Sequence, residues 1–332
     1  MSDEPRLLAG GSLRDRLRAQ VLVPVVAAPM FLCTGPDLAV AACAGGVVGT
    51  LTLNHCRDVA ELDGQLRRVR TALDRVREAE PDRVIGPLAV NTSLGLDRVA
   101  VRALLDACRR RGVEVVITAN GDPAEFVPAA HDAGVAVLHD VTSMRFATKA
   151  MAAGVDGLVA IGAGGGGHSG PLSPLTFVPM LRAAYDGLIV LAGTVTTGAM
   201  VRAAEVLGAD LAYVGTRFIA THESLAPAAY KEMLVASRAE DLRYTSAVNG
   251  VAANWLEPAL RRVGVDVDAL PATPARGHAH LPEGVRPWRD VWSAGQGVSL
   301  IDEVLPAAEV VARLRREYVA ACATPDLAGP AA

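Results

Sequence analysis

Residues 157–170 read GLVAIGAGGGGHSG. The stretch begins as an apolar run and ends with five glycines between Gly162 and Gly167, which His168 follows directly. An apolar run without polar alternation is typical of a strand buried on both faces of a parallel sheet. Glycine runs lose much backbone entropy on folding, so this one needs a structural reason. Three explanations of the glycine run remain open at this point: a dinucleotide fingerprint, a flexible linker, or backbone that lies against a large planar ligand.

Seven further apolar runs share this character. They are VLVPVVAAPM from Val21, GGVVGTLTL from Gly45, GPLAVNTS from Gly86, VEVVITAN from Val113, VAVLHDVTS from Val135, GLIVLAGTV from Gly187 and ADLAYVGTRF from Ala209. Helical periodicity lies between them, as in Val59, Leu62, Leu66, Val69, Leu73 and Val76. Several helices are expected to end in glycine, in DAGVAV, AAGVDGL and VLGADL. Eight strands alternating with helices predict a TIM (β/α)8 barrel, with an open doubly wound sheet as the alternative.

The strand rhythm stops after Phe218. Residues 1–218 are therefore assigned to the barrel. Residues 219–290 contain helical stretches such as AYKEMLVASRA and a loop rich in Pro, Gly and His, so we expect a smaller, mostly helical insertion there. Residues 291–325 include an amphipathic segment that is expected to pack back on the barrel.

Composition excludes several classes of function. The 332 residues carry a formal charge of −4 and no basic block, so neither a nucleic acid nor an anionic membrane is an expected partner. The charged N-terminus is not a secretory signal, and no apolar run is long enough to span a bilayer. Five scattered cysteines without a CxxC pair suit a reducing compartment and give no zinc site. We expect a cytoplasmic protein without a metal.

The context of the glycine run decides among its three explanations. Gly162, Gly164 and Gly167 match GxGxxG, but HSGPLSP follows, and its prolines delay the helix that a dinucleotide site needs. No GK[ST] follows, which excludes a P-loop. A linker does not fit because the run continues an apolar strand. The glycines therefore mark a strand end that approaches another group closely, and barrel enzymes build their sites at such ends.

The other strand ends are small and polar. They are Ala28-Pro29-Met30, Asn91, Thr118-Ala119-Asn120, Thr142-Ser143, Ala192-Gly193-Thr194 and Gly215-Thr216-Arg217. Barrels often bind a phosphate at the ends of the seventh and eighth strands. Arg217 is expected to pair either with such a phosphate or with a carboxylate. His139, inside the fifth strand, is interpreted as a core histidine.

These motifs, in this order, resemble the nitronate monooxygenase family. The resemblance rests on AAPM at 27–30, GGVVGTLT at 45–52, AVNTS at 89–93, GGGGHSG at 164–170, AGTVTTG at 192–198, VGTRF at 214–218, VNGVAANWL at 248–256 and SAGQGV at 293–298. It covers nearly the whole chain and implies an FMN-dependent barrel. The family also includes FMN-type enoyl-acyl-carrier-protein reductases and NAD(P)H:quinone reductases.

The resemblance assigns roles by position. It implies that Met30 lies against the isoalloxazine, that Asn91 bonds near the cofactor and that Thr142 also contacts it. Gly166 would let backbone approach the ring. The phosphate would be held by Gly193, Thr194, Gly215 and Thr216. His168 would be the catalytic residue.

The chain also departs from the family pattern. Ile161 stands where Gln is common, Gly164 where Glu is common, and AGT replaces AGG after the seventh strand. The resemblance favours oxidation of alkyl nitronates by O2 to carbonyl compounds and nitrite. The alternatives are NAD(P)H-dependent reduction of enoyl-thioesters or quinones and a flavin-binding barrel without turnover. The expected partners are a small-molecule substrate and O2; NAD(P)H and a second copy of the chain in a homodimer stay open.

Overall fold

All eight apolar runs form strands, and these strands build a parallel barrel. The computed structural model describes residues 11–270 and 277–323. The strands are β1 (Val25–Ala27), β2 (Gly49–Thr52), β3 (Leu88–Ser93), β4 (Val115–Ala119), β5 (Ala136–Val141), β6 (Gly157–Ile161), β8 (Leu188–Ala192) and β9 (Leu211–Val214), in the order β1-β9-β8-β6-β5-β4-β3-β2. The barrel closes where Ala27 N donates to Val48 O at 2.9 Å and Val48 N donates to Val25 O at 3.0 Å. The predicted barrel is confirmed, and the open sheet is not formed.

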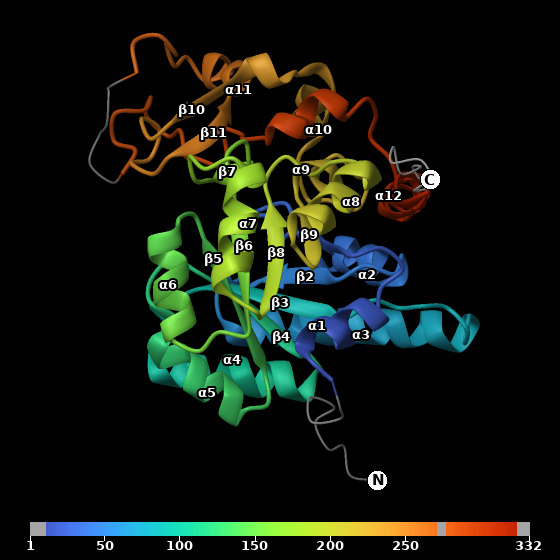
Figure 1. Ribbon diagram of the computed structural model, residues 1–332. Helices are drawn as coiled ribbons and strands as arrows, with labels where there is room; N and C mark the ends of the chain where they lie inside the picture. Colours follow the sequence, from blue (N-terminus) through green and yellow to red (C-terminus); the bar gives the residue numbers. More distant parts are fainter. Residues whose placement is uncertain (1–10, 271–276, 324–332) are drawn as a thin grey trace, which may run out of the picture.

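Helices cover the outside of the barrel (Figure 1). They are α2 (Pro36–Ala44), α3 (Val59–Ala79), α4 (Arg98–Arg110), α5 (Phe126–Asp132), α6 (Met144–Ala152), α7 (Pro174–Ala184) and α8 (Gly198–Leu207). Short 3-10 turns, η2 (Leu53–His55) and η3 (Pro123–Glu125), follow β2 and β4. The periodic segment 59–76 is helical as predicted. The predicted glycine ends also occur, since Gly134, Gly154 and Gly208 all have positive φ.

The eighth helix of the barrel comes from the far end of the chain. Helix α12 (Ala307–Cys322) contacts both α8 and α2, so it fills the gap in the outer ring. Glu317 Oε2 accepts a hydrogen bond from Gly198 N at 2.8 Å, and Tyr318 OH donates to Glu205 Oε2 at 2.8 Å. The Gly198 Cα faces the α12 backbone at Leu314 so closely that a Cβ would not fit. The ring of helices is therefore completed by residues far away in sequence.

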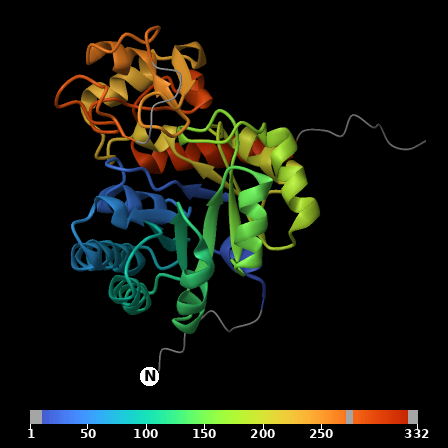
Figure 2. The same cartoon turned by 90° about the vertical axis from the view of Figure 1, so that its left-hand side faces the viewer.

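The segment between α9 (Thr216–Ile219) and α12 lies over the end of the barrel toward which the strands point (Figure 1), and Figure 2 shows the same arrangement from the side. It contains α10 (Ala228–Ala236), η4 (Ala239–Asp241), α11 (Glu257–Arg262) and η5 (Gln296–Leu300). It also contains β10 (Leu242–Thr245) and β11 (Ala253–Leu256), which pair antiparallel. Sequence reasoning predicted a mostly helical insertion and missed this pair, because neither short strand has a periodic pattern of its own. The boundaries at 218/219 and 290/291 remain a prediction.

Side chains inside the barrel are apolar in its lower layers. Val26, Val48, Ala89, Val159 and Val190 are all at most 3% exposed and belong to one interior cluster. Helix α1 (Leu13–Ala19) closes this end, and its N-cap Ser12 accepts a hydrogen bond from Asp15 N. Because alternate residues of each strand point inward, the same register fixes which residues reach the interior near the strand ends.

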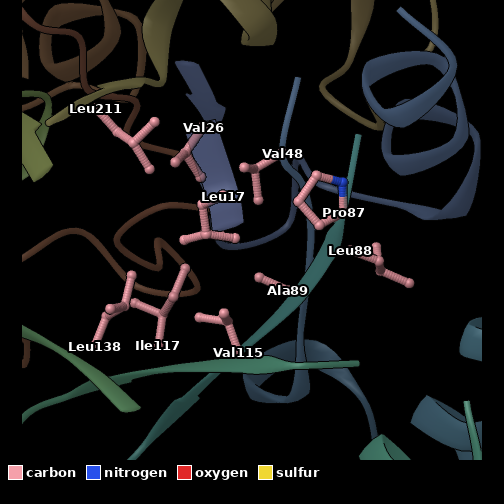
Figure 3. A pocket seen from close by; sticks show the side chains of 10 residues that line it. All are labelled: Leu17, Val26, Val48, Pro87, Leu88, Ala89, Val115, Ile117, Leu138 and Leu211. Atoms are coloured by element: carbon pink, nitrogen blue, oxygen red, sulfur yellow. The ribbon is translucent and has the colours of Figure 1, made fainter. Parts of the chain in front are cut away.

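Leu17 of α1 enters the barrel as a plug (Figure 3). It borders a cavity of about 10 Å³ whose ten lining residues are all apolar. Such a cavity offers no polar partner to a ligand, so it is a packing gap and not a candidate site.

We predict that Leu17→Ala lowers the free energy of unfolding by about 3 kcal/mol, because it removes a buried side chain and enlarges the cavity. Leu175→Ala is the matched control, since Leu175 is 72% exposed, and it should change stability by less than about 0.5 kcal/mol. Urea unfolding of both variants measures the difference. If the two substitutions lowered the free energy of unfolding equally, Leu17 would not be a buried packing residue of the barrel interior.

Candidate active site

The upper layer of the barrel interior is open, unlike the lower layers. Ala119, Asp140, Thr142, Ile161 and Tyr213 continue the inward-facing positions of their strands or directly follow them, and each stays half-buried. The residues beneath them are almost fully buried. Accessible surface inside the barrel is therefore concentrated at the strand ends, beneath the inserted segment. This open upper layer is the candidate active site.

The glycine run packs against the backbone of the inserted segment. A Cβ on Gly164 would lie 2.5 Å from Gln296 Oε1 and 2.6 Å from Thr194 Cγ2, and one on Gly166 would lie 2.9 Å from Gly295 N. Gln296 N donates to Gly164 O at 2.8 Å. The protein itself thus occupies the space that side chains would take. Gly166 nevertheless keeps an exposed backbone, so approach of a planar ring there remains a prediction.

Polar groups of β10 and β11 hold the end of the run. Asn254 Nδ2 donates to Gly165 O at 2.7 Å, and Tyr244 OH donates to Ser169 O at 3.0 Å. Ser169 N donates to Ala252 O at 3.3 Å. The loop that carries His168 is therefore fixed by a segment about 80 residues further along the chain, as the sequence separations of 89 for Asn254–Gly165 and 75 for Tyr244–Ser169 show.

His168 lies in the short strand β7 (Gly167–His168), beside an aromatic pair. Its ring is edge-on to Trp288, with the ring centroids 5.4 Å apart, and Trp288 packs on the fully buried Trp255 at 4.3 Å. Trp288 has φ +68°, which is rare for a bulky side chain and costs conformational energy. Sequence reasoning missed Trp288, and no local signal marks it, because only the fold brings it to His168.

Met30 lies three residues beyond the end of β1, and Asn91 lies within β3, two residues before the strand ends at Ser93. Met30 is half-buried, and its backbone N donates to Thr34 Oγ1 at 2.8 Å. Asn91 is 6% exposed; its Oδ1 accepts from Thr52 Oγ1 at 2.9 Å and from Asn54 Nδ2 at 3.2 Å, while its Nδ2 donates to Ile117 O at 3.1 Å. Asn91 is thus held in one orientation by its neighbours.

The loops after β8 and β9 present backbone donors. Within the residues that the structure describes, the N–H groups of Gly193, Thr194, Gly215 and Thr216 donate no hydrogen bond to the protein. Thr194 has φ +63°, a strained conformation for a β-branched residue. Thr216 Oγ1 accepts from Gly295 N at 2.9 Å, which ties this loop to the inserted segment. Backbone donors left free at adjacent strand ends suit an anionic group.

Two other residues singled out in the sequence have structural roles. Arg217 Nη1 donates to the Glu303 carbonyl at 2.8 Å, and burial lowers the pKa of Arg217. Arg217 therefore points toward the segment before α12. His139 faces outward from β5, where its Nδ1 lies 2.8 Å from Thr118 Oγ1, and burial lowers its pKa. It is a core histidine with a hydrogen-bond partner.

Asp140 and Tyr213 are site residues that sequence reasoning missed. Asp140 Oδ1 and Tyr213 OH are buried and make no hydrogen bond within the described chain. Burial raises the pKa of Asp140 to about 7, and burial together with the nearby Asp140 charge raises the pKa of Tyr213. An acidic residue at an inward position of an apolar strand was the available signal. Counting alternate positions along VAVLHDVTS would have found it.

In the ranges 11–270 and 277–323, no three His, Cys, Asp or Glu side chains lie together as a metal-binding group. None of the helices there is long and apolar enough to cross a bilayer.

Comparison with known proteins identifies similar chains. A family profile described as "Nitronate monooxygenase" matches residues 16–317. A nitronate monooxygenase of Pseudomonas aeruginosa is 29% identical, over 89% of this chain and 95% of its own. A dehydrogenase of Rhodococcus jostii is 28% identical, over 69% of this chain and 61% of its own. Its name gives a 5-hydroxy-7a-methyl-1-oxo-octahydro-1H-indene-4-carboxyl-CoA as the compound it acts on. The solved structure of a Streptomyces ansochromogenes nitroalkane oxidase superposes with a TM-score of 0.72 at 25% identity, covering 92% and 98% of the two chains.

The packing of the glycine run can be separated from its backbone conformation. Gly164 has φ +79° and Gly264 has φ +81°, but a Cβ on Gly264 meets nothing within 4 Å. Gly264→Ala should therefore cost only the left-handed strain of about 1–2 kcal/mol. Gly164→Ala should cost about 1–3 kcal/mol more, since it also overpacks the contact with Gln296. Thermal unfolding compares the two variants, and equal losses would rule out a packing requirement at Gly164.

Proposed function

The chain belongs to the nitronate monooxygenase family and is an oxidoreductase, and we propose that it is FMN-dependent and oxidises alkyl nitronates with O2 to carbonyl compounds and nitrite. The observation that carries the proposal is the meeting, at one end of the barrel, of His168, an open interior layer and four free backbone donors. The proposed reaction needs all three features together.

The residues at the strand ends fit FMN. The family is flavin-dependent. The free N–H groups at Gly193, Thr194, Gly215 and Thr216 suit a phosphate monoester, because they carry partial positive charge and lack protein acceptors. When bound, FMN would supply the ring that accepts electrons. Met30 would support one face of this ring, and Asn91, fixed by Thr52 and Asn54, would present its amide to the polar edge. Thr142 and Gly166 would border it.

His168 is proposed as the catalytic base for neutral nitroalkanes. The base must take the proton from the carbon next to the nitro group, which leaves the nitronate. Imidazole is the side chain that most often serves as a general base at neutral pH. The Trp288 edge and the backbone anchors at Gly165 and Ser169 hold the ring and its loop in place. A nitronate supplied as the anion needs no such base.

An NAD(P)H-dependent reductase of enoyl-thioester or quinone substrates is the second candidate. The Rhodococcus relative acts, by its name, on a CoA thioester. Ile161 places an apolar side chain where the family pattern commonly has Gln, so the pocket suits a less polar group there, while Gln296 and Thr194 fill the space beside Gly164. In this reading the electrons would come from NAD(P)H, and His168 would orient or protonate the substrate carbonyl.

We predict that the enzyme, purified with FMN, consumes O2 and releases nitrite when mixed with propyl-2-nitronate in air. An oxygen electrode and a nitrite assay follow the two products of the same reaction. FMN in the supernatant of the denatured enzyme confirms that the tested protein is loaded. No oxygen uptake and no nitrite, together with rapid anaerobic bleaching of the flavin by NADH or NADPH, would favour the reductase.

His168→Ala should keep the fold and the flavin but lower kcat/KM for neutral nitroalkanes by about 10²- to 10⁴-fold, because a positioned base is lost. The loss with preformed nitronates should be much smaller, since their proton is already gone. His222→Ala is the control, because the His222 side chain is exposed. Equal rates of wild type and His168→Ala with both substrates would show that His168 is structural.

A further inference from the structure

The floor of the open upper layer contains one acidic group. Asp140 lies on β5 two residues before Thr142, and Tyr213 lies on β9 two residues before Gly215. Ala136 and Leu138 of β5 and Leu211 of β9 belong to the interior cluster, so alternation turns Asp140 and Tyr213 into the barrel. The two side chains therefore lie one layer below strand-end residues that we assign to the cofactor.

Both polar ends lack a protein partner. Asp140 Oδ1 and Tyr213 OH are buried without a hydrogen bond among the described residues, although both residues keep some accessible surface. Unsatisfied buried polar groups are rare in folded proteins and need a reason. Both residues border the open layer, whereas these two polar atoms are themselves buried beneath it.

Within the part of the chain that the structure describes, no charged side chain compensates Asp140. The inward residues of the upper layer on the other strands are uncharged: Met30, Thr52, Asn91, Ala119, Ile161 and Ala192. Among the described inward residues, Tyr213 is the titratable group besides Asp140, and His168 is a further titratable group of the candidate site. Burial is the only cause that raises the pKa of Asp140, to about 7. This carboxyl therefore changes protonation close to neutral pH.

We propose that Asp140, with Tyr213 beside it, is a proton-accepting site that takes up one proton from solvent when the cofactor above it is reduced. The inference rests on the proposed flavin but not on the nitronate reaction. The electrons come from the substrate or from NAD(P)H. One O–H bond forms on the Asp140 carboxylate, no other bond of Asp140 breaks, and the proton returns to solvent on reoxidation.

The physical reason is repulsion between like charges in a site with little water. A negative charge added above an ionised carboxylate raises the pKa of that carboxyl, because the neutral form avoids the repulsion. Tyr213 acts as a positioning residue. Its hydroxyl makes no hydrogen bond to Asp140 in this structure, but it can donate to the carboxylate and accept from the protonated acid through one bound water. The pair can thus be satisfied in both protonation states.

The experiment is an equilibrium redox titration of the FMN-loaded enzyme with mediator dyes between pH 7 and 9. Each proton taken up per two electrons makes the reduction equilibrium tenfold less favourable per pH unit, which is about 30 mV. The reduction potential of wild type should fall by about 60 mV per pH unit, since the cofactor and Asp140 each take one proton. The reduction potential of Asp140→Asn should fall by about 30 mV per pH unit. Asp186→Asn, an exposed control, should keep the steep slope.

Equal slopes for wild type and Asp140→Asn would overturn the proposal. If Asp140→Asn does not hold FMN, the reduced-minus-oxidised infrared spectrum of wild type decides. A protonated carboxyl band should appear on reduction, and its absence would also overturn the proposal. Neither measurement uses a nitronate, so both test the role of Asp140 even if the enzyme does not oxidise nitronates.

The pH dependence of stability is a second measurement on the apoprotein. Between the ordinary pKa of 3.8 and about 7, the folded state holds the proton of Asp140 and the unfolded state does not. The contribution of Asp140 to the free energy of unfolding is therefore greatest below pH 3.8, falls as the pH rises to about 7, and is constant above that pH. The unfolding constant of wild type relative to Asp140→Asn should rise up to tenfold per pH unit in this window. If the ratio of the two unfolding constants did not change with pH, Asp140 would not be a neutral buried carboxyl in the folded state.

Discussion

The contact without side chains between the glycine run and residues 294–296 is the constraint on which the site depends. Strand β6 ends at the mouth of the barrel, and the inserted segment must cross it closely enough for Gln296 N to bond Gly164 O. A side chain on Gly166 would hold the two backbones apart, and one on Gly164 would clash with the side chains of Gln296 and Thr194. The same approach lets Asn254 reach Gly165 O and brings Trp288 to the ring of His168. One close backbone packing thus positions the catalytic candidate and the cover above it.

The barrel interior divides into two environments. Near α1 it is filled by apolar side chains, and the small cavity beside Leu17 has no polar lining. Near the strand ends it is open and contains Asp140 and Tyr213. A parallel barrel produces this division, because the carboxyl ends of all strands meet at one face while the packed layers lie below. The stability of the fold and the chemistry of the site therefore depend on different layers of the same strands.

The site combines rigid and strained elements. Asn91 is fixed by three hydrogen bonds, whereas Thr194 and Trp288 keep positive φ angles that their side chains disfavour. Such strain persists only where surrounding contacts hold it. At Thr194 the loop is wedged between Gly164 and Gly297, and at Trp288 the indole lies between Trp255 and His168. Strain therefore coincides with the loops proposed to hold phosphate and to shape the substrate pocket.

The sequence by itself determined the eight strands, the outer helices up to α8, and the place of His168 and the Gly–Thr pairs at strand ends. These follow from local periodicity and from the rule that parallel strands end at one face. Only the tertiary structure decided that α12 completes the ring, that β10 and β11 pair, and that Trp288 meets His168. It also decided that Asp140 and Tyr213 share one interior. Each of these depends on contacts between residues distant in sequence, and a local pattern carries no information about which distant partner will be adjacent.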